Sequence, residues 1–240
     1  MAADIHPPMM TDVISNPLMH SMQQFWDSWN ITHTDLNNVL NTWLVMIILI
    51  VVSLAVKSKL EMIPKGLQNF WEVIVSTLED IVVQTMGEHG RPYFPLIASL
   101  ALFILGCNLI GILPWMQSAT NNLNTTLALA LVSFVTTHYV GIREHGTHYV
   151  KHFMGPVPWL IPLMLPIELI GHFSRIISLA FRLFGNIMGE DLAIIILTLL
   201  LPYLVPLPMM VLQVFTSFIQ TLVFIMLTMM YISGSLEEAH

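Results

Sequence analysis

Long apolar runs, separated by short polar or proline-containing segments, dominate the chain from about residue 39 onward. A helix needs about 20 apolar residues to cross the hydrocarbon core of a bilayer. One further segment has apolar residues at helical spacing but carries Glu72, Glu79 and Asp80, a pattern typical of an amphipathic helix on a membrane surface. The pattern predicts five membrane-embedded helices over about 40–56, 93–113, 124–142, 167–201 and 209–233, and one interfacial helix over about 64–87.

The last two predicted helices are set off by prolines. Pro156, Pro158, Pro162 and Pro166 precede the first of them, and Pro202, Pro206 and Pro208 separate it from the second. At 1.5 Å per residue the first would be roughly 50 Å long, whereas the hydrocarbon core is about 30 Å thick. It must therefore slant steeply, forming a tilted hairpin with the last helix, or break near Gly185 or Gly189.

Composition agrees with this pattern. Hydrophobic residues make up 55% of the 240 residues and charged residues only 10%, whereas soluble domains have about 25% charged residues. We therefore expect an all-α polytopic membrane protein, with an extracytoplasmic segment 1–38 followed by a single membrane domain 39–240. The net charge of −7, with only eight basic residues, excludes a nucleic-acid-binding face. The single Cys107 excludes an internal disulfide framework.

The basic residues indicate an orientation. With five crossings, one side of the membrane holds Lys57, Lys59, Lys65, Arg91, Arg143 and Lys151. The segments 1–38, 114–123 and 202–208 fall on the other side and contain no Lys or Arg. Because basic loops stay in the cytoplasm, we expect the N-terminus outside and the C-terminus in the cytoplasm.

Arg182 lies in the middle of the most apolar part of the chain. A guanidinium stays protonated at physiological pH, and a charge at the bilayer centre costs at least about 2.5–3.5 kcal/mol on insertion scales. Heptad spacing places Glu168 and Arg175 on the same helical face. Arg175 could equally well form an ion pair with Glu168 near the helix end. The same stripe continues through His172 and Asn186, while Ser178, Gly185 and Gly189 keep it thin enough for another helix to approach.

Two adjacent acids and two amides complete the set of polar side chains in this region. Glu190 and Asp191 point away from Arg182 by about 80° and 180° around the helix, which favours a water-accessible proton site on a different face. They could alternatively cap a broken helix. On the last helix, Gln213 and Gln220 are one heptad apart and could hold a guanidinium or a water chain, or simply join two helices.

These residues resemble a known family. The run Ser178-Leu179-x-x-Arg182-Leu183-Phe184-Gly185-Asn186-x-x-Gly189 resembles the signature of subunit a of F-type ATP synthases. The later run Gln220-Thr221-Leu222-Val223-Phe224-x-x-Leu227-Thr228-x-x-Tyr231 is similar to the last helix of that family. The resemblance covers roughly residues 38–240.

The resemblance implies a non-catalytic stator subunit of the membrane sector, without a metal or cofactor of its own, in a bacterial inner membrane. Its partners are expected to be a ring of c subunits, subunit b of the peripheral stalk and the rest of the complex. Two proton half-channels are expected to reach the ring, with Arg182 opposite the ring carboxylate and Gln220 beside Arg182. Glu168 matches an acid of the cytoplasmic half-channel and Asp191 a position in the outer one. Gln213 departs from the family, which commonly has His or an acid there.

Two other classes of protein remain open from the residues alone. The histidines His138, His145, His148 and His152 have a spacing that a metal-dependent membrane enzyme could use. A secondary transporter would also carry intramembrane charges on proline-broken helices, and it predicts internal similarity between residues 40–142 and 156–233.

Overall fold

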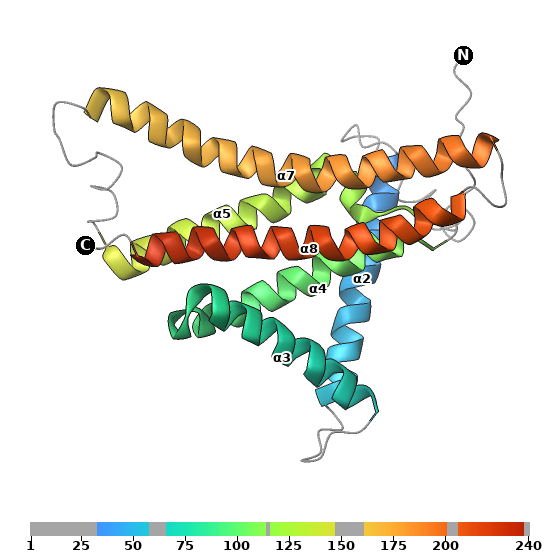
Figure 1. The fold of residues 1–240 in the computed structure, drawn as a ribbon, viewed down its shortest axis with the longest axis horizontal. Coiled ribbons are helices and arrows are strands. Elements are labelled where there is room, and N and C mark those ends of the chain that lie inside the picture. The colour runs from blue at the N-terminus through green and yellow to red at the C-terminus, as the bar shows by residue number, and fades with distance from the viewer. Residues whose placement is uncertain (1–32, 58–65, 114–115, 147–160, 201–205, 238–240) are drawn as a thin grey trace, which may run out of the picture.

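A computed structural model describes residues 33–57, 66–113, 116–146, 161–200 and 206–237 of the chain. The regular structure in these ranges is entirely helical, as predicted (Figure 1). The elements are α2 (His33–Lys57), α3 (Leu67–Met86), the 3-10 turn η1 (Glu88–Tyr93), α4 (Phe94–Ile110), the 3-10 turn η2 (Ala119–Asn121), α5 (Leu123–His145), α7 (Ile161–Leu200) and α8 (Pro206–Glu237).

The helices α7 and α8 form a long hairpin that lies on α4 and α5, while α2 runs across the hairpin direction (Figure 1). The main core joins four of these helices. It contains Leu100 and Ile104 of α4, Leu129 and Ala130 of α5, Ile176, Leu179, Ala180, Leu183 and Ile187 of α7, and Phe224 of α8. Since lipid is as apolar as these side chains, their close packing rather than water exclusion holds the helices together.

The helix α7 is continuous over 40 residues, or roughly 60 Å. It does not break at Gly185 or Gly189, so the predicted break is wrong, and the slant of the continuous helix in the membrane stays a prediction. Its predicted start was wrong, because the helix begins at Ile161 and includes Pro162 and Pro166. Proline is tolerated in the first turn, and helices in membranes accept one further along when neighbouring groups satisfy the freed backbone carbonyl.

The helix α8 also begins earlier than the pattern predicted. Pro206 and Pro208 belong to its first turn instead of to the break before it. The N–H groups of that turn have no partner within a helix in any case, so proline loses nothing there.

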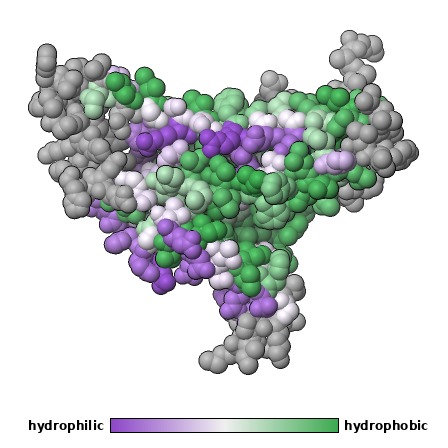
Figure 2. Space-filling view, in the orientation of Figure 1, coloured by the Kyte–Doolittle hydropathy of each residue, from purple (hydrophilic) through white to green (hydrophobic). Residues whose placement is uncertain are grey.

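The predicted amphipathic helix is confirmed as α3. It is bounded by Gly66 and Gly87, whose φ angles of 58° and 68° lie in the region that favours glycine. One side packs through Val82 and Met86 against α4 and α8. Hydrophilic residues gather on the visible surface at this side of the molecule (Figure 2).

The end of α4 is fixed by the loop that follows it. The predicted end near residue 113 is three residues too late, because α4 stops at Ile110. A Cβ on Gly111 would lie 2.9 Å from the backbone nitrogen of Ser118, so only glycine fits there without displacing the loop. The Ser118 hydroxyl donates to the Cys107 carbonyl at 2.9 Å, and the Thr120 hydroxyl donates to Asn108 Oδ1 at 2.6 Å. These buried bonds hold η2 against α4.

In the described ranges, four helical segments are long and apolar enough to cross a membrane. They are Asn38–Lys57, Glu88–Ile110, Leu123–His145 and Pro206–Leu236. The fifth predicted membrane-embedded helix, α7, packs along α8 but carries several charged residues. Of these four segments, the one in α2 is the least covered by the rest of the protein, with only 11% of its apolar stretch buried.

Candidate functional site

Three groups of polar side chains follow one another along α7. His172 lies ten residues before Arg182, and Asp191 lies nine residues after it. At 1.5 Å per residue these steps correspond to about 15 Å and about 13.5 Å along the helix axis. In the space-filling view, a narrow hydrophilic stripe runs along the hairpin between apolar borders (Figure 2).

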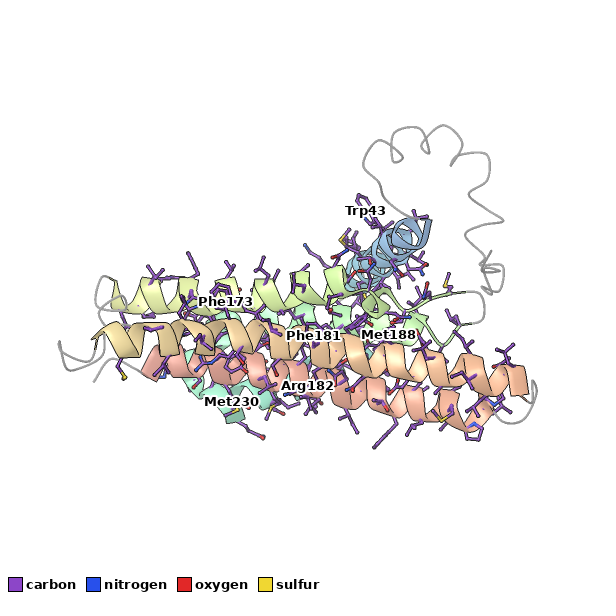
Figure 3. The ribbon with its side chains drawn as sticks, turned by 90° about the horizontal axis from the view of Figure 1, so that it is seen from above. Trp43, Phe173, Phe181, Arg182, Met188 and Met230 are labelled. Atoms are coloured by element: carbon purple, nitrogen blue, oxygen red, sulfur yellow. The ribbon has the colours of Figure 1, made fainter. Side chains whose placement is uncertain are left out.

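Arg182 lies on the open face of α7, near the middle of the hairpin (Figure 3). Among the described residues its guanidinium forms no hydrogen bond and no ion pair. Phe173 and Met188, which lie on either side of it along the helix, are 57% and 39% exposed. We call this exposed surface of α7 the Arg182 face.

The Arg182 face contains small residues, so few side chains protrude from it. Gly185 and Gly189 are exposed, and a Cβ added to either would meet nothing within 4 Å. Ser178 is exposed as well. The prediction that these residues admit a neighbouring helix is therefore not met by any described helix of this chain, and the space beside them is open.

Asn186 and Gln220 connect the two helices of the hairpin next to Arg182. Asn186 Nδ2 donates to Gln220 Oε1 at 2.8 Å, and the Gln220 side chain is 3% exposed. Glutamine has both donor and acceptor groups, so this bond fixes which way the Gln220 amide faces. Gln220 was predicted as a neighbour of the arginine stripe, and its partner is the asparagine one turn beyond Arg182.

Asp191 is the centre of a second group, which we call the Asp191 cluster. Gln213 Nε2 of α8 donates to Asp191 Oδ1 at 2.9 Å, and Asn121 Nδ2 of η2 donates to Asp191 Oδ2 at 2.7 Å. Next to it, Glu190 has a buried Oε2 atom without a hydrogen-bond partner in the described part of the chain. The two acids do not cap a helix break, since α7 continues through them.

The third group surrounds a small cavity between α5, α7 and α8. The Arg175 guanidinium lies over the Tyr231 ring, 5.2 Å from its centroid. The His172 ring lies beside that of His138, with centroids 4.9 Å apart. The Glu168 side chain lies outside the described residues, so its pairing with Arg175 and its place in a half-channel stay predictions.

Three members of these groups were not predicted as site residues, namely Asn121, His138 and Tyr231, and Tyr231 was noted only as part of the last-helix motif. Asn121 stood in an asparagine-rich stretch, but nothing in its spacing indicated that η2 would bring it to Asp191. His138 was predicted only as part of a histidine cluster, and its neighbour is His172 on another helix. A polar residue in an apolar helical run is the signal that both His138 and His172 share.

The histidine cluster itself is only partly described. His145 Nε2 lies 3.0 Å from the Ser235 carbonyl oxygen, far along α5 from the His138 contact. Within the described ranges, no three His, Cys, Asp or Glu side chains come together as metal ligands would. His148 and His152 lie outside those ranges.

The fold and these polar groups define an all-helical polytopic membrane protein whose long hairpin carries a charged arginine without a partner among the described residues. Residues 39–233 match the family model described as the ATP synthase A chain, and the chain belongs to this family. It is 51% identical over 236 residues to ATP synthase subunit a of Trichlorobacter lovleyi, covering 98% of this chain and 100% of the relative.

Other relatives carry the same name. The chain is 57% identical over 202 residues to ATP synthase subunit a of Citrifermentans bemidjiense, covering 84% of this chain and 88% of the relative. It is 56% identical over 199 residues to ATP synthase subunit a of Geobacter sulfurreducens, covering 83% and 87%. These relationships favour an ATP synthase subunit over a secondary transporter or a histidine-dependent enzyme.

Proposed function

We propose that this chain is the stator subunit that carries protons to and from a ring of c subunits, so that proton flow across the membrane drives ATP synthesis. The observation that carries the proposal is the Arg182 face: a permanent positive charge, exposed on a low apolar surface, with no acid beside it among the described residues. Such a charge fits a carboxylate that arrives on another subunit and leaves again.

The role of Arg182 follows from electrostatics. An immobile guanidinium favours the ionised form of a carboxylate that passes it. The ring carboxylate would therefore release its proton on one side before it takes another from the other side. The same charge opposes direct passage of a free proton between the two routes. Lysine is a poor substitute, because a buried ammonium can lose its proton.

The polar groups on either side of Arg182 support two half-channels. The Asp191 cluster lies toward the end of α7 that we assign to the outside, with Glu190 and Gln213 beside the carboxylate. The group around His172 and Arg175 lies toward the end that we assign to the cytoplasm. Glu168 is proposed to belong to this second route, while Ser178, Asn186 and Gln220 line the stretch between the two routes.

The orientation and the other partners follow from the same proposal. The basic loops support an orientation across a bacterial inner membrane with the C-terminus in the cytoplasm and the N-terminus outside. The subunit itself catalyses no reaction, and ATP forms in the catalytic head of the complex. The exposed apolar surface of α2 suits the lipid bilayer or a membrane helix of subunit b.

Replacing Arg182 tests the proposal. In the reconstituted complex, Arg182→Ala is expected to abolish proton-driven ATP synthesis, while the released head still hydrolyses ATP. Arg143→Ala is the matched control, since Arg143 is an exposed arginine at the end of α5, away from the hairpin face. It should leave coupled synthesis close to that of the unmodified complex. Normal coupled synthesis by Arg182→Ala would exclude the proposed role.

A further inference from the structure

A cavity in the first half of α7 contains two histidines that the proposed mechanism has not used. Its polar lining consists of Ser133, Thr137, His138, His172, Arg175 and Tyr231. The residues come from α5, α7 and α8, so the cavity forms only when all three helices pack together. We call it the histidine cavity.

The size of the histidine cavity suits water. Its volume is about 20 Å³, and a single water needs roughly 10–15 Å³ together with two to four polar partners. Hydroxyl, imidazole and guanidinium groups supply those partners. The apolar residues Ile176 and Leu179 form part of the wall and belong to the main core. A polar chamber therefore borders the core, and its lining residues on α7 lie about 4.5–15 Å before Arg182 along the helix axis.

The two imidazole rings are in direct contact. The centroids of His138 and His172 are 4.9 Å apart with an interplanar angle of 56°. The Phe134 ring packs against both histidines, with its centroid 4.1 Å from that of His138 and 6.3 Å from that of His172. This packing restricts the movement of both imidazole rings. An imidazole can accept a proton on one ring nitrogen and release another from the second, which leaves the neutral ring in its other tautomer, and proton exchange with water in the cavity restores the first tautomer.

The positive charge at the cavity favours passing a proton on over holding it on an imidazole. Arg175 faces the histidines from α7 and is permanently charged, while Tyr231 of α8 lies under its guanidinium. Two protonated imidazoles beside a guanidinium repel one another. A proton accepted by one ring is therefore passed on before the next arrives.

We propose that His138 and His172 form a proton relay in the half-channel that opens at the start of α7. This inference rests on the proposed function, since it assigns residues to one of the two routes. The ligand is the proton itself, carried between the rings and the water that the cavity can hold. The described lining of the cavity contains no carboxylate, so the two imidazoles are the groups there that can accept and release a proton.

The test uses the complex without its catalytic head, reconstituted in liposomes. A potassium diffusion potential drives protons through the membrane sector, and the flux is measured at equal inner and outer pH between about 5.5 and 8, where imidazoles titrate. The variant His138→Asn/His172→Asn removes both rings and keeps polar amides. His145→Asn is the matched control, because its ring contacts Ser235 outside the cavity.

The relay predicts a pH-dependent defect. Near pH 8 the proton flux of the double variant should be at least about tenfold lower than that of the unmodified complex. Loss of a positioned acid–base group slows proton transfer by about 10²–10⁴-fold, and we expect a smaller loss here because water partly replaces the rings. Near pH 5.5 protons are abundant and the difference should shrink. The His145→Asn control should keep both the flux and its pH profile.

Three results would overturn the relay. They are unchanged flux in the double variant, a decrease by the same factor at every pH, and an unmodified complex whose flux does not vary across this range. If the asparagine variant does not assemble, His138→Gln/His172→Gln keeps more side-chain volume and is measured in the same way. Unchanged flux together with an uncoupled Arg182→Ala complex rejects only the relay, whereas coupled synthesis by Arg182→Ala rejects the proposed function.

Discussion

Asp191 offers the sharpest test of the proposed outer half-channel, because two amides donate to its two carboxylate oxygens. The perturbation is Asp191→Asn, which keeps the shape but removes the charge. The introduced amide has one acceptor oxygen and one NH₂ group. Its oxygen can accept a hydrogen bond from either Asn121 or Gln213. Its NH₂ group then faces the NH₂ group of the remaining amide, and two donors form no hydrogen bond.

The structure sets the expected magnitude. Losing one charge-assisted hydrogen bond destabilises the cluster by about 1.5–3 kcal/mol, a change of roughly 10- to 150-fold in the population of the paired arrangement. Losing a positioned acid–base group slows a proton transfer by about 10²–10⁴-fold. Proton flux in Asp191→Asn should therefore fall by at least about 10²-fold. Glu190→Gln should reduce it less, because Glu190 lacks the two donors that position Asp191.

A swap of the two groups separates geometry from charge. In Asp191→Asn/Gln213→Glu the carboxylate moves to α8 and the amide to α7. The asparagine introduced at position 191 can accept from Asn121 and donate to the new carboxylate, so every hydrogen bond of the cluster is satisfied again. Passive flux through the headless complex in liposomes should recover by tenfold or more relative to Asp191→Asn, at about 1.4 kcal/mol per tenfold.

The refuting results for this prediction are definite. Wild-type flux in both Asp191→Asn and Glu190→Gln would show that the route lies elsewhere. A swap variant that assembles but conducts no better than Asp191→Asn would show that the hydrogen-bonded carboxylate is not what the cluster supplies.

Two further predictions concern packing. A double-mutant cycle with Asn186→Ala and Gln220→Ala, measured by thermal unfolding in detergent, should give a coupling energy of about 0.6–1.7 kcal/mol, as for other hydrogen bonds between membrane helices. A coupling energy near zero would mean that this bond does not form. Gly111→Ala should destabilise the subunit by about 1–3 kcal/mol, because its Cβ meets the Ser118 backbone at 2.9 Å. Gly185→Ala, in open space, should leave unfolding of the isolated subunit unchanged, and equal effects of the two glycine variants would contradict the structure.

The helices were largely predictable because the bilayer imposes a length and an apolar composition on each. Boundaries failed where this rule conflicted with local preferences. Pro166 predicts a helix start on backbone grounds, but it lies inside α7 because no other regular structure is available to a chain in lipid. The end of α4 was misplaced because it depends on the approach of Ser118 to Gly111, a contact without sequence periodicity.

The candidate site was predictable where it follows a single helix. Helical spacing placed Arg182, Asn186 and Asp191 correctly around α7, because a continuous helix fixes their directions. Contacts between helices were not predictable in this way. Asn121 reaches Asp191 only because buried hydrogen bonds from Ser118 and Thr120 hold η2 against α4.

The unbroken length of α7 has an electrical consequence. His172 and Asp191 are separated by about 28 Å along its axis. If the whole helix of roughly 60 Å lies within a core of about 30 Å, it is inclined by about 60°. About 25 Å of that separation then lies in the membrane plane and only about 14 Å along the normal. If each half-channel carries the potential of its own side inward, the membrane voltage, worth about 2.3 kcal/mol per charge per 100 mV, falls along this inclined path. The field at Arg182 would then point mainly within the membrane plane, so a charge on the proposed ring of c subunits would be pushed around the ring instead of through the bilayer.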